Sequence, residues 1–565
     1  MMWEPTVVNI EKRRQSLESA RNSWIGEWRE IRDNLMPDLG VFTLSPQQQG
    51  RGERTDSNIL DSTGTMAAHY LAAGLMAGLS PANRPWFKLL PRDPDLATHA
   101  PVRRYLDDAE AAMYQVFGHS NFYNCAHHVY LELGTFNTAA QSILSDPMDA
   151  IITKTYTIGE YALGQNQAGR VNEWCRAYIM TADQMVDAFG MDELPPSVQA
   201  DVRDSARGQN QHIVVHYVGP NPGTDPEKMD AASMPYVSLF YLDGKHENKF
   251  LRRGGFRQFP FQTPRWFVKP NDVWGVGPGR WALPDVKMLQ RQTEDMLVGA
   301  AKLVDPPTIA TTDILANGGV NSVPGGVTVV NQMAPGSAGQ GARSLYDNYR
   351  PDLSALSSLV INTQNMIRER FFANLFASIL MGSDTQKTAR EIIERSNEKM
   401  TLIGPVVDRL QSEYLKPTVE RTFSIIQEMG MLPDAPEELE GQELTISYKS
   451  ILAQAQQMVG LTQMEQGFLF LGNLAKVKPE VLDKLDGDKL ADSYWGALGA
   501  PSDCLHDENE VLEIRTERAK KEQLQEAAAY AQQGAQTAQT LGQTPAGGNN
   551  ALSALMGAMG QVAGR

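Results

Sequence analysis

Cysteine is scarce in this chain of 565 residues, in which only Cys125, Cys175 and Cys504 occur, far apart. Three cysteines at such spacing exclude a disulfide framework and favour a reducing compartment. Long apolar runs are missing as well: none reaches membrane-spanning length, and the N-terminal residues lack the apolar core of a signal peptide. We therefore expect a soluble protein, made inside the cell, that has no membrane partner.

Basic residues are fewer than acidic ones, 51 against 67. The chain carries a formal net charge of −16 and has a pI of about 5.1. Proteins that bind nucleic acid over a broad surface are usually basic, because neutralising phosphates supplies most of the non-specific affinity. Any contact with DNA is thus expected to be local, weak or repelled. The length predicts several domains or one elaborate subunit.

Catalytic motifs are absent too. The sequence contains no GxSxG, no HExxH and no kinase-like set. Cys125, His127 and His128, with His119 nearby, fit no structural zinc pattern, and the acidic stretch 485–493 lacks the spacing of a calcium loop. These observations predict a protein that is not an enzyme and holds no metal or other cofactor.

One stretch does invite a chemical interpretation: residues 274–289 read WGVGPGRWALPDVKML. A Gly-rich turn before a helix is the general form of a phosphate-binding loop. The stretch lacks the Lys-Ser/Thr ending of a P-loop and the strand context of a dinucleotide fingerprint. A structural turn is favoured, and an intracellular enzyme with a nucleotide site at 275–280 stays open as the alternative.

Periodicity predicts a mostly helical first region. Apolar residues at steps of three and four predict helices over 9–36, 61–79, 101–118 and 121–145. From residue 150 the chain changes to β-branched and aromatic runs separated by turn residues, with a hairpin soon after residue 150. The fold class is therefore α+β and mostly helical.

Long helices dominate the second half. Pro284 and Asp285 suit the first turn of a helix that ends before Pro306, and a second helix is predicted over 352–376. A third begins with a capping box near residue 388, is interrupted at Gly404–Pro405 and ends near Gly430. A short strand LTISY and a charged helix from residue 511 follow, before a low-complexity tail.

The stretch 305–351 between the first two long helices is rich in Gly, Asn, Ser and Pro. A connection of this length is unusual in a compact monomer. We interpret it as a small module that is exposed for assembly. The half-apolar helices on either side of it would then pack side by side in an oligomer.

Four extended segments, in order, resemble one known family. They read LDSTGTMAAHYLAAGLMAGLSPANRPWFKL, WGVGPGRWALPDVKMLQRQTEDMLVGAAKLVDPPTI, RERFFANLFASIL and QKTAREIIERSNEKMTLIGPVVDRLQSEYLKPTVERTF. Over essentially the whole chain, the sequence resembles the portal proteins, or head-to-tail connectors, of short-tailed bacteriophages. Another ring-forming head-tail adaptor is the remaining alternative, and the long insertion between two stem-like helices argues against it.

The resemblance implies a homo-oligomeric ring, usually of about twelve subunits, around an axial channel at one capsid vertex. Double-stranded DNA would pass through the channel without sequence specificity, during packaging by the terminase and later during ejection. Implied partners are the terminase, the tail adaptor or head completion proteins, and the major capsid and scaffolding proteins. The implied location is the virion, after assembly in the host cytoplasm.

The resemblance also divides the chain into the regions of a portal-protein fold. These are an N-terminal wing (1–283, helical over 1–149 and sheet-containing over 150–273), stem helices (284–304 and 352–376), a clip (305–351), a channel loop (377–388), a long wing helix (389–433), a crown (434–513) and a C-terminal helix with the low-complexity tail (514–565).

Candidate site residues follow from these regions. The channel-loop candidates are Ser383, Asp384, Thr385, Gln386 and Lys387. Lys302 and Lys387 are candidates for weak guidance of DNA, with an ordinary surface or ion-pair role as the alternative. The stem-packing or intersubunit candidates are Val286, Leu289, Arg291, Asp295, Met296 and Leu297, of which Arg291 and Asp295 form either a solvated helix pair or a bridge between subunits. The wing–stem joint is predicted at Gly275, Gly277, Pro278, Gly279 and Pro284.

Overall fold

The computed structural model describes residues 6–43, 59–93, 96, 99–204, 207–225, 228, 230–244, 249–304, 308–310, 342–344, 353–376, 403–439, 444–448, 470, 511–525 and 528–529. The chain divides into two units, Met1–Gln456 and Gln457–Arg565. In the second unit a helix covers residues 511–525, as the sequence predicts. No helix in these ranges has the length and hydropathy to cross a membrane.

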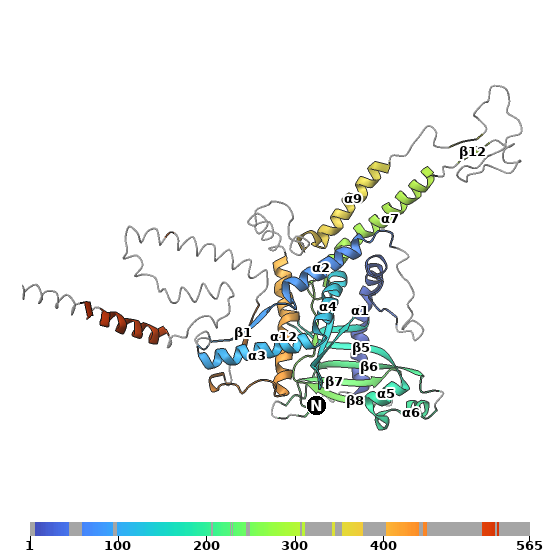
Figure 1. The fold of residues 1–565 in the computed structure, drawn as a ribbon. Helices are drawn as coiled ribbons and strands as arrows, with labels where there is room; N and C mark the ends of the chain where they lie inside the picture. Colours follow the sequence, from blue (N-terminus) through green and yellow to red (C-terminus); the bar gives the residue numbers. More distant parts are fainter. Residues whose placement is uncertain are drawn as a thin grey trace, which may run out of the picture. The chain divides into compact units, whose positions relative to one another are not determined.

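Helices α1 (Val7–Leu35), α2 (Thr63–Leu79), α3 (Ala100–His119) and α4 (Phe122–Phe136) begin the first unit (Figure 1). The Thr6 hydroxyl caps α1 by accepting from the Asn9 N–H at 3.4 Å. Helix α2 is made largely of Ala, Gly and Leu, and its small side chains allow close packing on α4, from which Gly134 presents no side chain to Leu71.

The expectation that residues 1–149 are entirely helical is wrong. Strands β1 (Phe87–Pro91) and β2 (Ala140–Asp146) lie within this region. The helix predicted over 121–145 ends at Phe136, because Asn137 adopts a left-handed conformation with φ of 65° and terminates it. The residues that follow pair as a strand instead.

A five-stranded antiparallel sheet has the order β4–β5–β6–β7–β8. The predicted hairpin is confirmed: β4 and β5 are joined by a turn in which Gly169 has a φ of 75°. Helices α5 and α6, with a short 3-10 turn between them, separate β5 from β6 and were not predicted. The bounds are β4 (Tyr161–Gln165), β5 (Val171–Thr181), α5 (Ala182–Phe189), η3 (Met191–Glu193), α6 (Pro196–Arg203), β6 (Gln211–Pro220), β7 (Tyr236–Leu242) and β8 (Arg252–Phe256).

Smaller sheets complete the strands. Strands β3 (Ala150–Tyr156), β2 and β9 (Phe261–Gln262) form a three-stranded sheet in that order, and β10 (Phe267–Val268) pairs with β11 (Gly275–Val276). Within the expected clip, β12 (Thr308–Ala310) pairs with β13 (Ala342–Ser344). The rest of 305–351 lies outside the described residues.

Two long helices run antiparallel and side by side, α7 (Pro278–Val304) and α9 (Leu353–Arg370), as Figure 1 shows. Helix α7 begins six residues before the predicted start, so that Pro284 lies inside it. Helix α9 ends at Arg370 rather than at 376, because Phe372 has a φ of 53°, and residues 373–376 form a separate helical turn.

The last long helix is described from Ile403. It continues through residues 403–410, a π-helical turn η4 (Gln411–Leu415) and α12 (Lys416–Glu428), and it ends before Gly430, whose φ is 68°. The end near Gly430 is therefore confirmed. Gly404 and Pro405 lie in the first described turn of this helix, and the residues before Ile403 lie outside the described residues, so the interruption predicted there stays a prediction. The irregularity within the described part is the π-helical turn, which was not predicted.

Strand β14 (Leu444–Tyr448) is the predicted LTISY strand, and it pairs antiparallel with β1. A short 3-10 turn, η5 (Glu437–Leu439), precedes it. The first strand of the expected crown is thus a partner of the N-terminal region. The rest of the expected crown, apart from residues 434–439, 470 and 511–513, lies outside the described residues. So do the acidic stretch 485–493, the channel-loop candidates 383–387 and residues 389–402.

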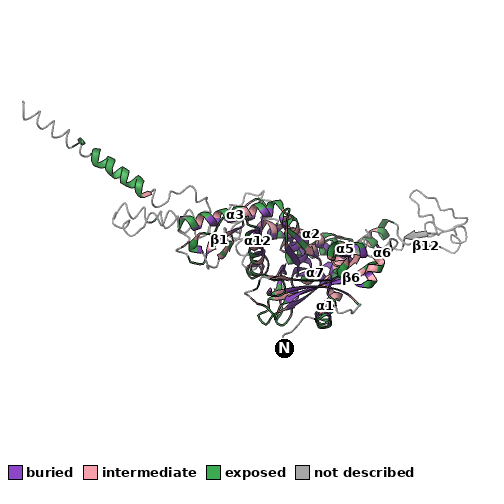
Figure 2. Cartoon of the chain, turned by 90° about the horizontal axis from the view of Figure 1, so that it is seen from below, coloured by how far each residue is buried: buried purple, intermediate pink, exposed green. Residues whose placement is uncertain are grey.

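The principal core is rich in aromatic side chains and lies between the helices and the two larger sheets (Figure 2). A smaller core lies between α1 and one face of the five-stranded sheet, and another lies under α5 and α6. The bulkiest side chains that are essentially inaccessible to solvent are those of Trp28, Trp86, Trp174, Trp266 and Trp274.

Candidate functional site: the joint and the α7–α9 pair

The glycines before and within the first turn of α7 permit close approach of two backbone segments. A Cβ atom on Gly275 would lie 2.0 Å from the Asn137 carbonyl oxygen, and one on Gly279 would lie 1.7 Å from that of Thr135. Neither glycine has a positive φ. Glycine is therefore required at these positions for close contact with the end of α4, and not for an unusual backbone conformation.

This packing argues against a phosphate cradle. Residues 275–279 are all buried, and the Gly275 N–H donates to the Thr138 hydroxyl at 2.8 Å. Gly277 faces Trp266, whose ring would lie 2.6 Å from an added Cβ atom. A phosphate needs exposed N–H groups at such a loop, and this loop has its glycines covered by protein.

Aromatic rings hold the joint on both sides. The Trp274 ring meets that of Trp28 from α1 edge-on, with centroids 4.8 Å apart. Trp266 stacks on Phe372, with centroids 6.1 Å apart, at the position where α9 has ended. The joint therefore contacts α1 on one side and the end of α9 on the other.

A polar network fixes α7 to the segment before α2. The N–H groups of Leu60 and Asp61 donate to Gln290 Oε1 at 2.7 and 2.9 Å, and Gln290 Nε2 donates to the Asp61 carbonyl oxygen at 2.8 Å. Gln364 of α9 donates to the Asp61 carboxylate at 2.7 Å. This short segment before α2 thus bonds to both long helices. The sequence patterns did not predict this network. The available signal was a glutamine at a helical position that the apolar periodicity assigns to the buried face.

Ion pairs support the same arrangement. Arg370 donates to Asp285 at 3.0 Å and so joins the end of α9 to the first half of α7. Arg280 and Lys287 of α7 lie 3.3 and 3.2 Å from Glu27 and Glu30 of α1.

The stem-packing candidates divide into two groups. Val286 and Leu289 are fully buried in the chain's own core, so an intersubunit role for these two is not supported. Met296 is half-buried at the edge of this core. Leu297 is 54% exposed.

The charged candidates on α7 are exposed. Arg291 lies 3.4 Å from Asp295, as the spacing predicts, and 2.9 Å from Glu294. The Arg291 side chain is 70% exposed, and Lys302 lies in the last turn of α7 with its side chain also exposed. Within this chain, the Arg291–Asp295 contact is a solvated helix pair.

On α7 and α9, the exposure of apolar side chains increases toward the end of α7 and the start of α9, which flank residues 305–351. Every buried residue of α7 lies at or before Thr293. Several large apolar side chains on the pair face solvent in this single chain: Met288, Leu297, Val298, Leu303 and Val304 on α7, and Leu359, Ile361 and Met366 on α9.

The histidine cluster does not converge. The Cys125 thiol donates to the Thr153 carbonyl oxygen at 3.4 Å, and the rings of His127 and His128 are 6.3 Å apart. Within the part of the chain that the structure describes, no three His, Cys, Asp or Glu side chains are grouped as metal ligands.

A family model described as bacteriophage head to tail connecting protein matches residues 8–505. A probable portal protein of Bordetella phage BPP-1 is 36% identical over 540 residues, which cover 95% of each chain. The portal protein of Salmonella phage epsilon15 is 35% identical over 560 residues, which cover 99% of each chain.

Two solved structures are similar over much of their length. A chain from the virion of a native gene transfer agent particle has 10% identity and a TM-score of 0.30, with 82% of this chain and 96% of that chain covered. A chain from the neck of an empty gene transfer agent particle has 10% identity and a TM-score of 0.31, with 85% and 96% covered. Such TM-scores are too low to assign a fold.

Proposed function

This chain belongs to the bacteriophage head to tail connecting protein family, and we propose on that premise that its copies assemble through α7 and α9 into a ring around an axial channel. The family is structural, and the function of this chain is that of a phage portal, the head-to-tail connector. The ring has cyclic symmetry, because one repeated head-to-tail interface that closes gives a ring. The family resemblance implies about twelve subunits.

The observation that carries the ring proposal is the exposed apolar surface of the α7–α9 pair. In a soluble monomer, large contiguous apolar surfaces are uncommon and mark interaction sites. On this pair, residues such as Leu297, Val298 and Ile361 face solvent, while the opposite faces of the same helices are packed. A second copy of the pair would cover these side chains, since both helices are long enough to present a continuous seam.

The regional assignments follow from the same proposal. The helix pair forms the stem, with its first helix extended back to Pro278, and the stretch between the two helices forms the clip. Residues before α7 and the long helix ending at Glu428 form the wing. We assign residues 377–388 to the channel loop and the residues after β14 to the crown, as the family resemblance implies.

The partners follow from the position of such a ring. The ring occupies one capsid vertex of the virion after assembly in the host cytoplasm, and it contacts major capsid and scaffolding proteins there. The clip serves the terminase first and the tail adaptor afterwards. Double-stranded DNA crosses the channel in both directions without sequence-specific contacts.

The charge of the chain suits a conduit. A net charge of −16 per subunit opposes strong retention of phosphates, so DNA can slide. Lys302 is exposed at the far end of α7 and supplies a weak, isolated contact. Lys387 is assigned the same role in the channel loop.

The test is an electron-microscopic view of the purified full chain along its symmetry axis. A ring with an open axial hole is expected. A monodisperse monomer at all concentrations, or a closed globular oligomer with no hole, would contradict the proposal.

A further inference from the structure

Four residues on neighbouring strands form a row across one face of the five-stranded sheet. The register pairs Arg176 of β5 with His216 of β6, His216 with Phe240 of β7, and Phe240 with Arg252 of β8. Residues directly opposite each other in an antiparallel sheet point to the same face. The row therefore places two arginines on the two sides of two stacked rings.

The rings in this row are only partly covered. Phe240 stacks on His216 with centroids 3.9 Å apart and planes within 6°, and Phe189 of α5 lies 5.5 Å from Phe240. The side chains of Arg176, His216 and Phe240 are all half-buried. The His216 ring also contacts Trp174 of the core, with centroids 5.4 Å apart, whereas Arg252 is exposed. The row is therefore open to a ligand at its β8 end.

Positive charge is concentrated here. Lys154 of β3 and Arg176 both lie over the Tyr156 ring, at 5.7 and 5.1 Å from its centroid. Burial, together with the charges of Arg176, Arg252 and Lys154, lowers the pKa of His216 to about 3. The three cations from three strands thus surround one neutral imidazole.

Carboxylates do not balance this charge. Arg176 pairs with Glu160 at 3.1 Å. Among the residues that the structure describes, no carboxylate lies within ion-pair distance of Lys154 or Arg252. Three cations share one acid in a chain whose net charge is −16. Such like-charge crowding is unfavourable until an anion joins it.

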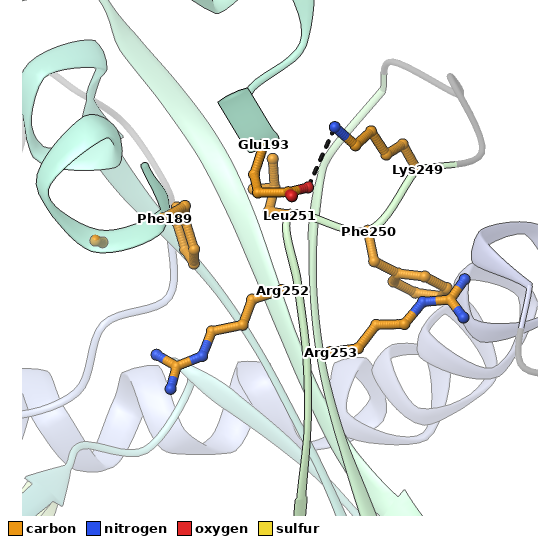
Figure 3. Close-up of a pocket in the computed structure, with 8 residues that line it drawn as sticks. Phe189, Glu193, Lys249, Phe250, Leu251, Arg252 and Arg253 are labelled. Atoms are coloured by element: carbon orange, nitrogen blue, oxygen red, sulfur yellow. Dashed lines mark ion pairs between the residues drawn. The ribbon is translucent and has the colours of Figure 1, made fainter. Parts of the chain in front are cut away.

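A groove of about 660 Å³ continues from Arg252 along the start of β8 (Figure 3). Arg252 and Arg253 extend to opposite sides of the strand, and Arg253 covers the Phe250 ring at 4.7 Å. Lys249 pairs with Glu193 at 3.2 Å on the groove wall. The remaining lining is largely apolar: Ala188, Phe189, Phe250 and Leu251.

We propose that the cations Lys154, Arg176 and Arg252, with the groove at the start of β8, bind an acidic segment of a partner polypeptide. Arginine fits a carboxylate with two parallel hydrogen bonds, and the apolar lining accepts the side chains between the acids. The site is distinct from the α7–α9 surface, and it does not depend on ring closure.

A polypeptide fits better than duplex DNA. A duplex carries one charge per about 1.7 Å of axis and needs an extended basic surface. Here the cations are few, Glu160 and Glu193 stand among them, and half of the groove is apolar. One or two carboxylates on an otherwise apolar segment match this pattern.

The test uses the full chain and a fluorescein-labelled Val-Glu-Val-Glu-Val peptide, which carries two glutamates, and binding is measured by fluorescence anisotropy at low salt. The same peptide with glutamine for glutamate, and a short DNA duplex, serve as competitors. We expect the acidic peptide to bind and the glutamine peptide to bind at least about tenfold more weakly.

Two substitutions locate the site. Arg252→Glu, and separately Arg252→Gln in case charge reversal disturbs folding, should weaken binding by about tenfold or more. Lys416→Glu is the control for charge reversal, since Lys416 is also an exposed cation, 59% accessible, on α12, and it should change binding by less than about twofold. Three results would each overturn the proposal: unchanged peptide binding by both Arg252 variants, no binding of the acidic peptide, or preferential binding of the duplex.

Ring formation is measured separately on the same variants. Failure of the peptide proposal can therefore be distinguished from failure of the assembly proposal.

Discussion

The guanidinium of Arg265 lies 2.6 Å from the carboxylate of Glu413, and this contact joins the segment before β10 to the π-helical turn of the last long helix. Arg265 is only 2% exposed, and its other N–H groups donate to the carbonyl oxygens of Gly169 and Val273 at 2.9 and 3.3 Å. One buried cation therefore connects the β4–β5 turn, the segment just before the joint and the helix. The extra residue of the π-helical turn coincides with the position at which Glu413 meets this cation.

Glu413→Gln should destabilise the subunit by about 3 kcal/mol, because removing one partner leaves the Arg265 charge buried without compensation. Thermal unfolding measures the change. Glu420→Gln is the control: its pair with Lys416 spans 3.7 Å and is half-exposed, so a loss below about 1 kcal/mol is expected. Equal effects of the two substitutions would show that the buried pair has no special role.

Gly275→Ala should cost about 3 kcal/mol and impair ring assembly, since its Cβ atom would lie 2.0 Å from a backbone oxygen that cannot move without shifting the end of α4. Gly78→Ala is the matched substitution in α2, where an added Cβ atom meets nothing within 4 Å. That variant should be unchanged or more stable by about 0.5–1 kcal/mol. Unfolding curves of both variants give the comparison, and a neutral Gly275→Ala would refute the close-approach interpretation.

Gln290→Leu should destabilise the docking of α7 by about 1–3 kcal/mol, because the N–H groups of Leu60 and Asp61 lose their acceptor. Gln292→Leu removes only one of two acceptors within reach of the single Thr363 hydroxyl hydrogen, and the main-chain oxygen of Leu359 remains, so its effect should be smaller. Hydrogen exchange at residues 60–63 reports the difference. Comparable protection in the two variants would contradict it.

Leu297→Asp should prevent ring formation while leaving the monomer folded, because Leu297 is 54% exposed in the single chain. Mass photometry gives the oligomeric state and circular dichroism the fold. Met148→Asp is the control, since Met148 is 92% exposed on the β2–β3 turn, away from the helix pair in the sequence and fold. Rings of normal yield from Leu297→Asp would contradict the assigned interface.

Glu132 should make stability fall as pH rises. Burial raises the pKa of this carboxyl from 4.5 to about 8, against the opposing hydrogen bonds from Thr157 and Ile158. Between about pH 4.5 and 8 the unfolded chain loses a proton that the folded chain keeps, so the contribution from this group decreases by up to about 1.4 kcal/mol per pH unit.

Glu132→Gln cannot titrate and should remove this part of the pH dependence, so that its stability relative to the wild type increases across the window. Unfolding at a series of pH values tests it, with the exposed Glu438→Gln as control. Parallel wild-type and Glu132→Gln profiles would show that another group is responsible.

Sequence patterns predicted the elements that depend on local chemistry. The helices have apolar periodicity, the β4–β5 hairpin has turn residues at 166–169, and the last helix ends where Gly430 allows a left-handed conformation. The start of α7 was missed because glycine and proline have low helix propensity, and the contact of Gly279 with Thr135 involves a residue far away in the sequence. The break at Phe372 likewise has no local signal, since a phenylalanine rarely takes a positive φ and is held there by its neighbours.

In the candidate site, too, local features could be predicted from the sequence and long-range contacts could not. The glycines at 275–279 were identifiable from sequence, but their contact with residues 135–138 was not. Gln290 and Asp61 are 229 residues apart, and Arg265 and Glu413 are 148 apart, so neither pair leaves a periodic pattern. The exposed face of α7–α9 could be recognised only once the packed face was known.

The pairing of β1 with β14 has a consequence for synthesis. Strand β1 leaves the ribosome long before residues 444–448, and at about 5–20 residues per second the interval is on the order of tens of seconds. Throughout that time a newly made subunit has an unpaired strand that includes Phe87 and Leu89, with Lys88 as its one charged residue. The subunit can therefore finish folding only after residues 444–448 have been synthesised. Before then, neighbouring incomplete chains can pair wrongly through their unpaired strands.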